Sequence, residues 1–252
     1  MAPKNVDVVL VIDASDSMRP CINQLRAHLR ELVKPMQGSM GKVRFGLVAV
    51  SALREAQGNG MVFPIETLAS RNGQESMQAL YGNASNQYEL LTEDADKVIA
   101  ALDAIQVQGD ENNLLALDLA LDHPFGPVST TKRVVALFSD EPLETGMEAA
   151  LWSHKISALV NKIHQRRVKL FCALPYSDLA QELSQANGSE IEAVDGGQGL
   201  SSVDFSALLT QMGKSISVSS MQGGLEESYE RALFGQDRWP KGIPDPNSRD
   251  GL

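Results

Sequence analysis

Two kinds of apolar pattern alternate along the chain. Short runs rich in β-branched residues are apolar on both faces, which is typical of strands buried in the middle of a parallel sheet. Two weaker and more polar runs predict edge strands, and Pro64 supports this for the first, because proline cannot donate a hydrogen bond to a neighbouring strand. The predicted central strands are residues 6–12, 43–50, 133–138 and 168–174, and the predicted edge strands are residues 61–68 and 189–194.

Segments with helical periodicity lie between these runs. A helix is expected after Thr92, with Glu93 and Asp94 in its first turn, where acidic side chains interact favourably with the helix dipole. Because strands alternate with helices, the sequence predicts the α/β class, with a Rossmann-like, doubly wound, mostly parallel six-stranded sheet flanked by helices. The other predicted helices span residues 21–36, 112–122, 146–166, 176–187 and 201–216.

The alternating pattern continues without a clear break, so we predict one domain over residues 1–217. It is interrupted at about residues 69–87, a polar stretch rich in Asn, Gly and Ser that we interpret as an inserted surface loop. Such a loop is either variable decoration or a contact for a partner protein. The glycine-rich stretch at residues 194–200 lacks the lysine of a phosphate-binding loop, and we interpret it as a plain loop.

Residues 218–252 form a predicted C-terminal tail, partly extended because its end is rich in Pro and Gly. Its middle part favours a short helix and carries three aromatic side chains, Tyr229, Phe234 and Trp239. Aromatic residues are enriched where proteins bind one another. The tail is therefore a candidate docking segment, either for its own domain or for a partner.

Composition narrows the classes of partner. The formal net charge of the 252 residues is −10, which argues against nucleic acid or an anionic membrane as the main partner. No stretch reaches 18 apolar residues, and the first apolar run is too short for a signal peptide, so we expect a cytoplasmic protein. The two cysteines, Cys21 and Cys172, have no histidine nearby and predict neither a zinc site nor a disulfide framework.

Oxygen-bearing side chains follow two of the predicted central strands. Asp13, Ser15 and Ser17 come directly after the first strand, and Asp140 comes just after the strand at residues 133–138. In open α/β sheets, ligands bind beyond the carboxyl ends of the strands. If these two strands are neighbours, two carboxylates meet at one rim, where they repel each other unless a positive charge separates them. Carboxylate and hydroxyl oxygens favour Mg²⁺, with Mn²⁺ or Ca²⁺ as alternatives.

A purely structural interpretation of the same residues is that they cap the helix that follows. The spacing Asp-x-Ser-x-Ser, together with a second strand ending in Ser-Asp, favours the metal site. Asp16 lies between the two serines and is expected to point outward as a charge at the rim, where it is a candidate contact for a partner protein. Ser139 is interpreted as a hydroxyl at the strand end and not as a ligand.

The stretch "VVLVIDASDSM" followed by an amphipathic helix, with "VVALFSDEP" far downstream, resembles the von Willebrand factor A (vWA) domain. The resemblance covers roughly residues 5–217. It implies a metal-ion-dependent adhesion site (MIDAS) in which Asp13, Ser15, Ser17 and Asp140 hold a divalent cation, some of them through water. It further implies that an acidic residue of a partner protein completes the coordination of that cation.

One element departs from the family's pattern, which has a threonine just before the helix that corresponds to residues 112–122. This chain has no threonine there, and the slot falls on Glu111, with Asp110 or Asn112 as neighbours that could serve instead. A carboxylate at Glu111 would neutralise more of the cation's charge and weaken its attraction for an incoming acid. The alternative is that these residues only cap the helix.

The resemblance implies a non-enzymatic module that assembles a protein complex in a metal-dependent way. Intracellular vWA proteins of this size are mostly bacterial and often work with AAA+ ATPases or in stress and defence systems. An alternative is a vWA scaffold with a degenerate or empty metal site that binds through its loop and tail. A Mg²⁺-dependent phosphatase is a further alternative, but the position two residues after Asp13 is Ser15, where such enzymes need a second aspartate.

Overall fold

The computed structural model describes residues 4–53, 61–67, 90–105, 107, 113–143, 156–186 and 189–221. Within these residues the chain forms a six-stranded sheet in the order β3-β2-β1-β4-β5-β6. All neighbouring strands are parallel except β3, which runs antiparallel to β2. The strands are β1 (Asn5–Asp13), β2 (Val43–Leu53), β3 (Met61–Thr67), β4 (Thr131–Phe138), β5 (Val168–Leu174) and β6 (Glu190–Ala193). The predicted α/β fold with a mostly parallel sheet is confirmed, and both predicted edge strands lie at the edges.

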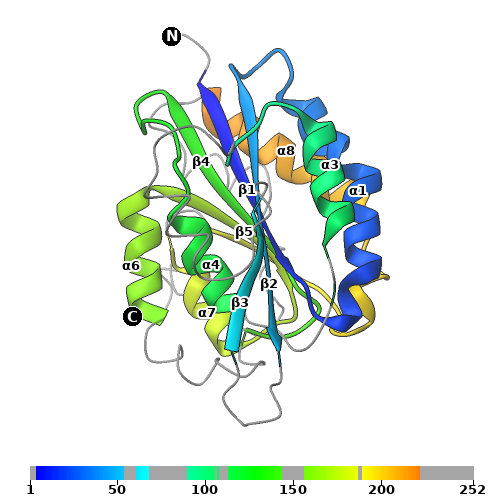
Figure 1. The fold of residues 1–252 in the computed structure, drawn as a ribbon. Coiled ribbons are helices and arrows are strands. Elements are labelled where there is room, and N and C mark those ends of the chain that lie inside the picture. Colours follow the sequence, from blue (N-terminus) through cyan, green and yellow to red (C-terminus); the bar gives the residue numbers. More distant parts are fainter. Residues whose placement is uncertain are drawn as a thin grey trace, which may run out of the picture.

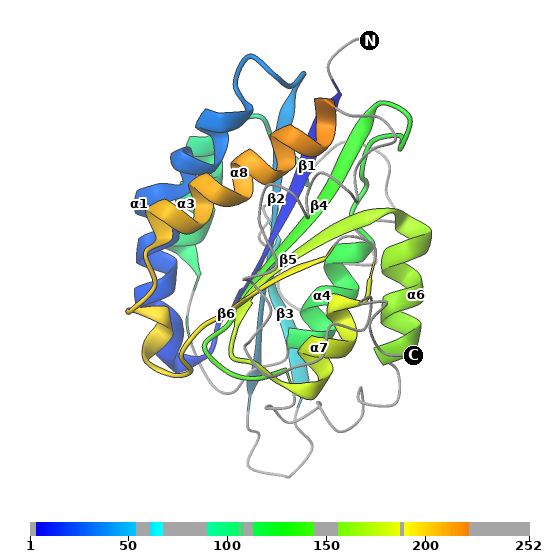
Figure 2. The same cartoon turned by 180° about the vertical axis from the view of Figure 1, so that it is seen from behind.

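Helices cover both faces of the sheet (Figures 1 and 2). One face packs against α1 (Arg19–Val33), α3 (Ala95–Ala104) and α8 (Phe205–Met221), and the other packs against α4 (Asn113–Leu121), α6 (Ile156–Arg166) and α7 (Asp178–Ser184). The central strand β1 contributes to both layers, because Leu10 and Ile12 point into the first core and Val9 and Val11 into the second. Side chains alternate across a strand, so a strand covered on both faces is apolar at most of its positions. No helix among the described residues is long and apolar enough to cross a membrane.

Several element boundaries differ from the predicted ones. The helix α3 begins at Ala95, and Asp94 is its N-cap, accepting hydrogen bonds from the backbone N–H groups of Asp96 and Lys97. Thr92, which was expected to precede the helix directly, pairs its backbone with Phe45 of β2 instead. Asp94 is the better cap because its side chain reaches two unpaired N–H groups of the first turn.

Two other helices also differ in their bounds from the predicted ones. The α1 helix starts at Arg19 and ends at Val33, and a short 3₁₀ helix, η2 (Lys34–Met36), follows it at Pro35. At the other end, α8 continues to Met221, past the predicted boundary at residue 217. The predicted loop at residues 69–87 lies outside the described residues, as does the tail beyond residue 221.

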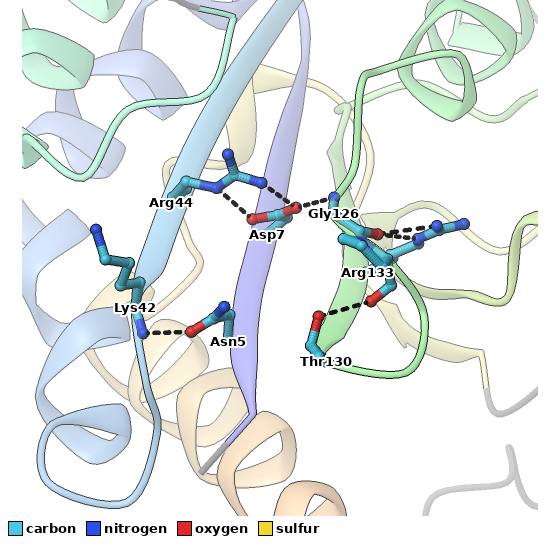
Figure 3. A network of polar contacts seen from close by, with 8 residues as sticks. Asn5, Asp7, Lys42, Arg44, Gly126, Thr130 and Arg133 are labelled. Carbon is cyan, nitrogen blue, oxygen red and sulfur yellow. Dashed lines mark hydrogen bonds and ion pairs between the residues drawn. The ribbon is translucent and has the colours of Figure 1, made fainter. Parts of the chain in front are cut away.

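A polar network holds the amino-terminal ends of the central strands together (Figure 3). Asp7 of β1 is fully buried and accepts two hydrogen bonds from Arg44 of β2, both 2.8 Å long. The backbone N–H of Gly126 donates a third to Asp7 at 2.7 Å, and the Gly126 carbonyl accepts from Arg133 of β4. The hydrogen bonds to Asp7 raise the pKa of Arg44. The network supplies hydrogen bonds to a buried carboxylate and connects the three neighbouring strands β2, β1 and β4 near their amino-terminal ends.

Candidate functional site

The loop after β1 forms one part of the candidate site. Asp13 is the last residue of β1, and its Oδ1 accepts a hydrogen bond of 2.8 Å from the backbone N–H of Ser15. This contact closes a tight turn that leads into the short 3₁₀ helix η1 (Asp16–Met18) and then into α1. The turn leaves Asp13 and Ser15 buried and Ser17 exposed. The local sequence therefore places the two serine hydroxyls next to a buried carboxylate.

The end of β4 supplies the second part. β1 and β4 are neighbours, with Ile12 opposite Phe138, so their carboxyl ends meet at one rim. Ser17 lies 123 positions from Asp140 in the sequence, and its hydroxyl donates a hydrogen bond of 2.9 Å to the Asp140 Oδ1. The hydroxyl oxygens of Ser15 and Ser17 are 3.3 Å apart. The structure thus brings together Asp13, Ser15, Ser17 and Asp140, four of the five residues predicted to bind metal.

Two further polar residues, Ser139 and Asn113, are connected to Asp13 by hydrogen bonds. The sequence analysis did not predict these contacts. The hydroxyl of Ser139 donates to the Asp13 Oδ2 at 2.7 Å and accepts from the Asn113 Nδ2 at 2.8 Å. It also accepts from the backbone N–H of Glu141 at 3.1 Å. Asn113 is the first residue of α4, and its Oδ1 is buried without a hydrogen-bond partner. The signal for Ser139 was its position beside Asp140, whereas nothing local connects Asn113 to the site.

The glycine-rich loop at residues 194–200 is the third part of the site, which the sequence interpretation as a plain loop did not anticipate. The backbone N–H of Gly199 donates to the Asp140 Oδ2, and that of Gly197 donates to the Asp140 carbonyl, both at 2.7 Å. Both residues have a positive φ, +78° at Gly197 and +60° at Gly199, which glycine adopts without strain. These contacts fix the position of the Asp140 carboxylate.

The acidic side chains share a poorly solvated rim. The pKa of Asp13 is raised from 3.8 to about 6, mainly by burial and to a smaller extent by the nearby Asp140, which together outweigh the lowering by hydrogen bonds from Ser139 and Ser15. Burial also raises the pKa of Glu141, with Asp140 as a second cause, and that of the Cys21 thiol, with Asp13 and Asp140 as further causes. The ionised forms of Asp13 and Glu141 are therefore disfavoured, and a nearby cation would stabilise them.

The same arrangement of strands and helices occurs in a known protein family. The family model of the von Willebrand factor type A domain matches residues 7–193. The chain belongs to this family. Domains of the vWA family typically bind other proteins. No curated protein matches the vWA chain significantly.

Solved structures resemble the vWA chain in fold. The crystal structure titled "SpRpn10 VWA domain" has a TM-score of 0.50 at 14% identity, covering 82% of this chain and 96% of the other. The pilus adhesin SpaC from Lactobacillus rhamnosus GG has a TM-score of 0.51 at 16% identity, covering 86% of this chain and 31% of the adhesin. A von Willebrand factor type A protein from Catenulispora acidiphila has a TM-score of 0.46 at 15% identity, covering 88% of this chain and 43% of the other. At these identities the resemblance concerns the fold alone.

The remaining predicted residues fall in different places. Asp16 is exposed, as expected for a side chain that points outward at the rim. Glu111, with its alternatives Asp110 and Asn112, lies outside the described residues, as do Tyr229, Phe234 and Trp239. Among the described residues, no group of three or more His, Cys, Asp or Glu gathers in a metal-binding arrangement. The candidate site, called the rim site below, consists of the side-chain oxygens of Asp13, Ser15, Ser17 and Asp140.

The close approach of the glycine-rich loop leads to a testable expectation. A Cβ atom at Gly199 would overlap the backbone oxygen of Ser17 and lie 2.8 Å from the Cδ of Pro20. We expect Gly199→Ala to lower the free energy of unfolding by about 2 kcal/mol more than Gly38→Ala, because Gly38 also has a positive φ (+80°) but its Cβ would meet open space. Gly197→Ala is no control for this effect, because the backbone of Gly197 (φ 78°, ψ 178°) lies in a region that essentially only glycine adopts. Equal losses in chemical denaturation of Gly199→Ala and Gly38→Ala would contradict the expectation.

Proposed function

We propose that this vWA chain is a non-enzymatic protein-binding module that depends on a divalent cation held at the rim site. One observation carries the proposal. The Ser17 hydroxyl, in the loop after Asp13, donates a hydrogen bond to Asp140, and this contact lies at the carboxyl ends of the neighbouring strands β1 and β4. Ligands of open α/β sheets bind at such a rim. The positions of these residues support the MIDAS interpretation.

The residues present fit a hard divalent cation. Asp13 and Asp140 would hold it through carboxylate oxygens, and Ser15 and Ser17 through hydroxyl oxygens, some of them through water. Oxygen ligands of this kind suit Mg²⁺, with Mn²⁺ or Ca²⁺ as alternatives, and none of the four is a nitrogen or sulfur ligand of the type that zinc or copper favours. When bound, the ion supplies an acceptor position for a carboxylate from outside the chain.

The proposed partner is a protein that offers an Asp or Glu to this position. The chain carries a formal net charge of −10, so its overall charge does not attract an acidic side chain, whereas a bound cation would attract one locally. A bound cation would therefore give the contact a defined place. By its family resemblance, the partner class we propose is an AAA+ ATPase or a component of a stress or defence system.

A catalytic function has less support at this rim. The position two residues after Asp13 is Ser15, so the second carboxylate that a phosphatase of the aspartyl-phosphate type needs is missing there. Asp13 itself accepts hydrogen bonds through both of its oxygens, from Ser15 and Ser139. A carboxylate held in this way suits a fixed ligand, and we propose that it performs no chemistry.

The test is capture of partners by the tagged chain from a lysate of the native host. We expect a partner to be retained in Mg²⁺ and lost in EDTA, and to be lost with Asp13→Ala even when Mg²⁺ is present. Asp16→Ala is the matched control for Mg²⁺ binding, because Asp16 lies in the same loop but is exposed and outside the proposed ligand set. Retained proteins are identified by mass spectrometry.

Calorimetric titration of the purified chain with Mg²⁺ accompanies the capture. Saturable binding by the wild type and by Asp16→Ala, but not by Asp13→Ala, is the expected result. A partner retained equally in Mg²⁺, in EDTA and by Asp13→Ala would overturn the proposal. That result would favour the alternative of a vWA scaffold with an idle site.

A further inference from the structure

We propose that Asn113 contributes its side-chain carbonyl oxygen to the coordination sphere of the cation, as a neutral ligand from the α4 side of the rim. This inference rests on the proposed function, because it requires that a cation binds there. Asn113 directly follows the candidate ligands Asp110, Glu111 and Asn112 in the sequence but was not itself a predicted ligand. The hydrogen bonds of Ser139 and the burial of Asn113 support it.

The hydroxyl of Ser139 determines which way the Asn113 amide faces. A serine hydroxyl has one proton to donate and two lone pairs that accept. When Asp13 is ionised it can only accept, so the proton of Ser139 goes to the Asp13 Oδ2 at 2.7 Å and not to the Glu141 carbonyl, which lies 3.2 Å from the same hydroxyl. The lone pairs of Ser139 then accept from the Glu141 N–H at 3.1 Å and from the Asn113 Nδ2 at 2.8 Å.

An Asn113 amide turned the other way would place two acceptors against each other with no proton between them. The hydrogen bonds therefore require the nitrogen of Asn113 to face Ser139, and they direct its Oδ1 elsewhere. This oxygen is buried and has no hydrogen-bond partner, and the whole residue is 2% exposed. Buried carbonyl oxygens in folded proteins are almost always paired, so an unpaired one beside a ligand site indicates a missing partner.

Asn113 is joined to the proposed ligand Asp13 through one shared hydrogen-bond partner. It is the first residue of α4, a helix that packs on β1 and β2, and the Ser139 hydroxyl bonds both its amide and the Asp13 carboxylate. The helix α4 lies on the sheet face opposite to α1, the helix that follows Ser15 and Ser17. Asn113 is therefore a candidate ligand from an element other than the Asp13 loop.

The chemistry of an amide oxygen suits this role. Amide carbonyls are ordinary ligands of hard divalent cations, and they add no charge. With Asp13 and Asp140 both ionised, a divalent ion and its protein ligands would sum to zero charge. A neutral third ligand preserves the attraction for an incoming carboxylate, whereas a third carboxylate would weaken it.

The experiment is calorimetric titration of the full chain with Mg²⁺ in three forms: wild type, Asn113→Ala and Asn113→Asp. Losing a residue that supports a ligand typically lowers metal affinity by about 10- to 100-fold, and losing a ligand should cost at least as much. We expect Asn113→Ala to weaken Mg²⁺ binding by about tenfold or more. Asn113→Asp keeps an oxygen ligand at position 113 but loses the hydrogen-bond donor to Ser139, so it distinguishes a ligand from a residue that only positions Asp13 through Ser139.

An unchanged Mg²⁺ affinity of Asn113→Ala would overturn the inference, as would an Asn113→Asp variant that binds Mg²⁺ as weakly as Asn113→Ala. If the alanine variant does not fold, Asn113→Asp decides. If position 113 supplies a ligand, the carboxylate of Asn113→Asp keeps Mg²⁺ binding at least as tight as in the wild type. If Asn113 is purely structural, this variant loses the donor to Ser139 and binding falls. A wild type that binds no Mg²⁺ refutes the proposed function, whereas binding without any dependence on Asn113 refutes this inference alone.

Discussion

Replacing Asp13 by Asn is expected to stabilise the metal-free protein and to remove its response to Mg²⁺. The side chain of Asp13 is buried, and burial raises its pKa from 3.8 to about 6. The free energy that corresponds to this difference is about 3 kcal/mol, which is the upper limit of the stabilisation at pH 8. In the wild type, Mg²⁺ at a hundred times its dissociation constant would add about 2.7 kcal/mol, and the variant lacks this gain. Thermal unfolding in EDTA and in Mg²⁺ measures both effects.

The direction of the pH dependence follows from the raised pKa of Asp13. Between pH 3.8 and about 6 the folded protein holds the Asp13 proton more tightly than the unfolded chain does. The contribution of Asp13 to stability is therefore present below pH 3.8 and is lost as the pH rises through 6. The advantage of Asp13→Asn over the wild type in EDTA should be greatest above pH 6 and should vanish below pH 4.

Asp16→Asn is the matched control for Asp13→Asn, because it removes the same charge from an exposed position in the same loop. It is expected to change stability little and to leave the response to Mg²⁺ intact. Our account of the rim site would be wrong if Asp13→Asn destabilised the protein in EDTA at pH 8. It would also be wrong if that variant still gained stability from Mg²⁺.

Arg44→Met should lower the free energy of unfolding by about 3 kcal/mol or more. Asp7 is fully buried, whereas the Arg44 side chain is 34% exposed, and Arg44 supplies two of the three hydrogen bonds that the Asp7 carboxylate accepts in this network. Removing one partner of such a pair leaves an uncompensated charge in the interior, which typically costs about 3–5 kcal/mol. Chemical denaturation at neutral pH measures the change.

Lys42→Met provides the control for Arg44→Met. Lys42 lies directly before β2, and its ammonium group pairs with Glu93 at the surface, where both side chains are more than half exposed. Pairs of this kind contribute about 0–1 kcal/mol, so the control should remain close to the wild type. Similar losses in the two variants would show that the Asp7 network contributes no more than a surface pair.

The strands were predictable because their signal is local. Each central strand contains a short run of apolar residues, and in β1 Val9 and Val11 face one core while Leu10 and Ile12 face the other. An uninterrupted apolar run is not expected of a strand with one face in water, so the sequence alone indicates a sheet covered on both faces. Element ends were less predictable, since Asp94 and Thr92 are both reasonable caps and only the pairing of Thr92 with Phe45 decides between them.

The candidate site shows the same division. The order of strands and helices, and the Asp-x-Ser-x-Ser spacing after β1, are properties of short segments, and the sequence by itself determined them. Only the tertiary structure decided that Asn113, Ser139 and Gly199 complete the rim, because their contacts join segments far apart in the chain. The same holds for Asp7, whose partners come from β2 and from the segment before β4. Periodicity reports which side of an element is buried, whereas a hydrogen bond depends on which two elements the packed sheet makes neighbours.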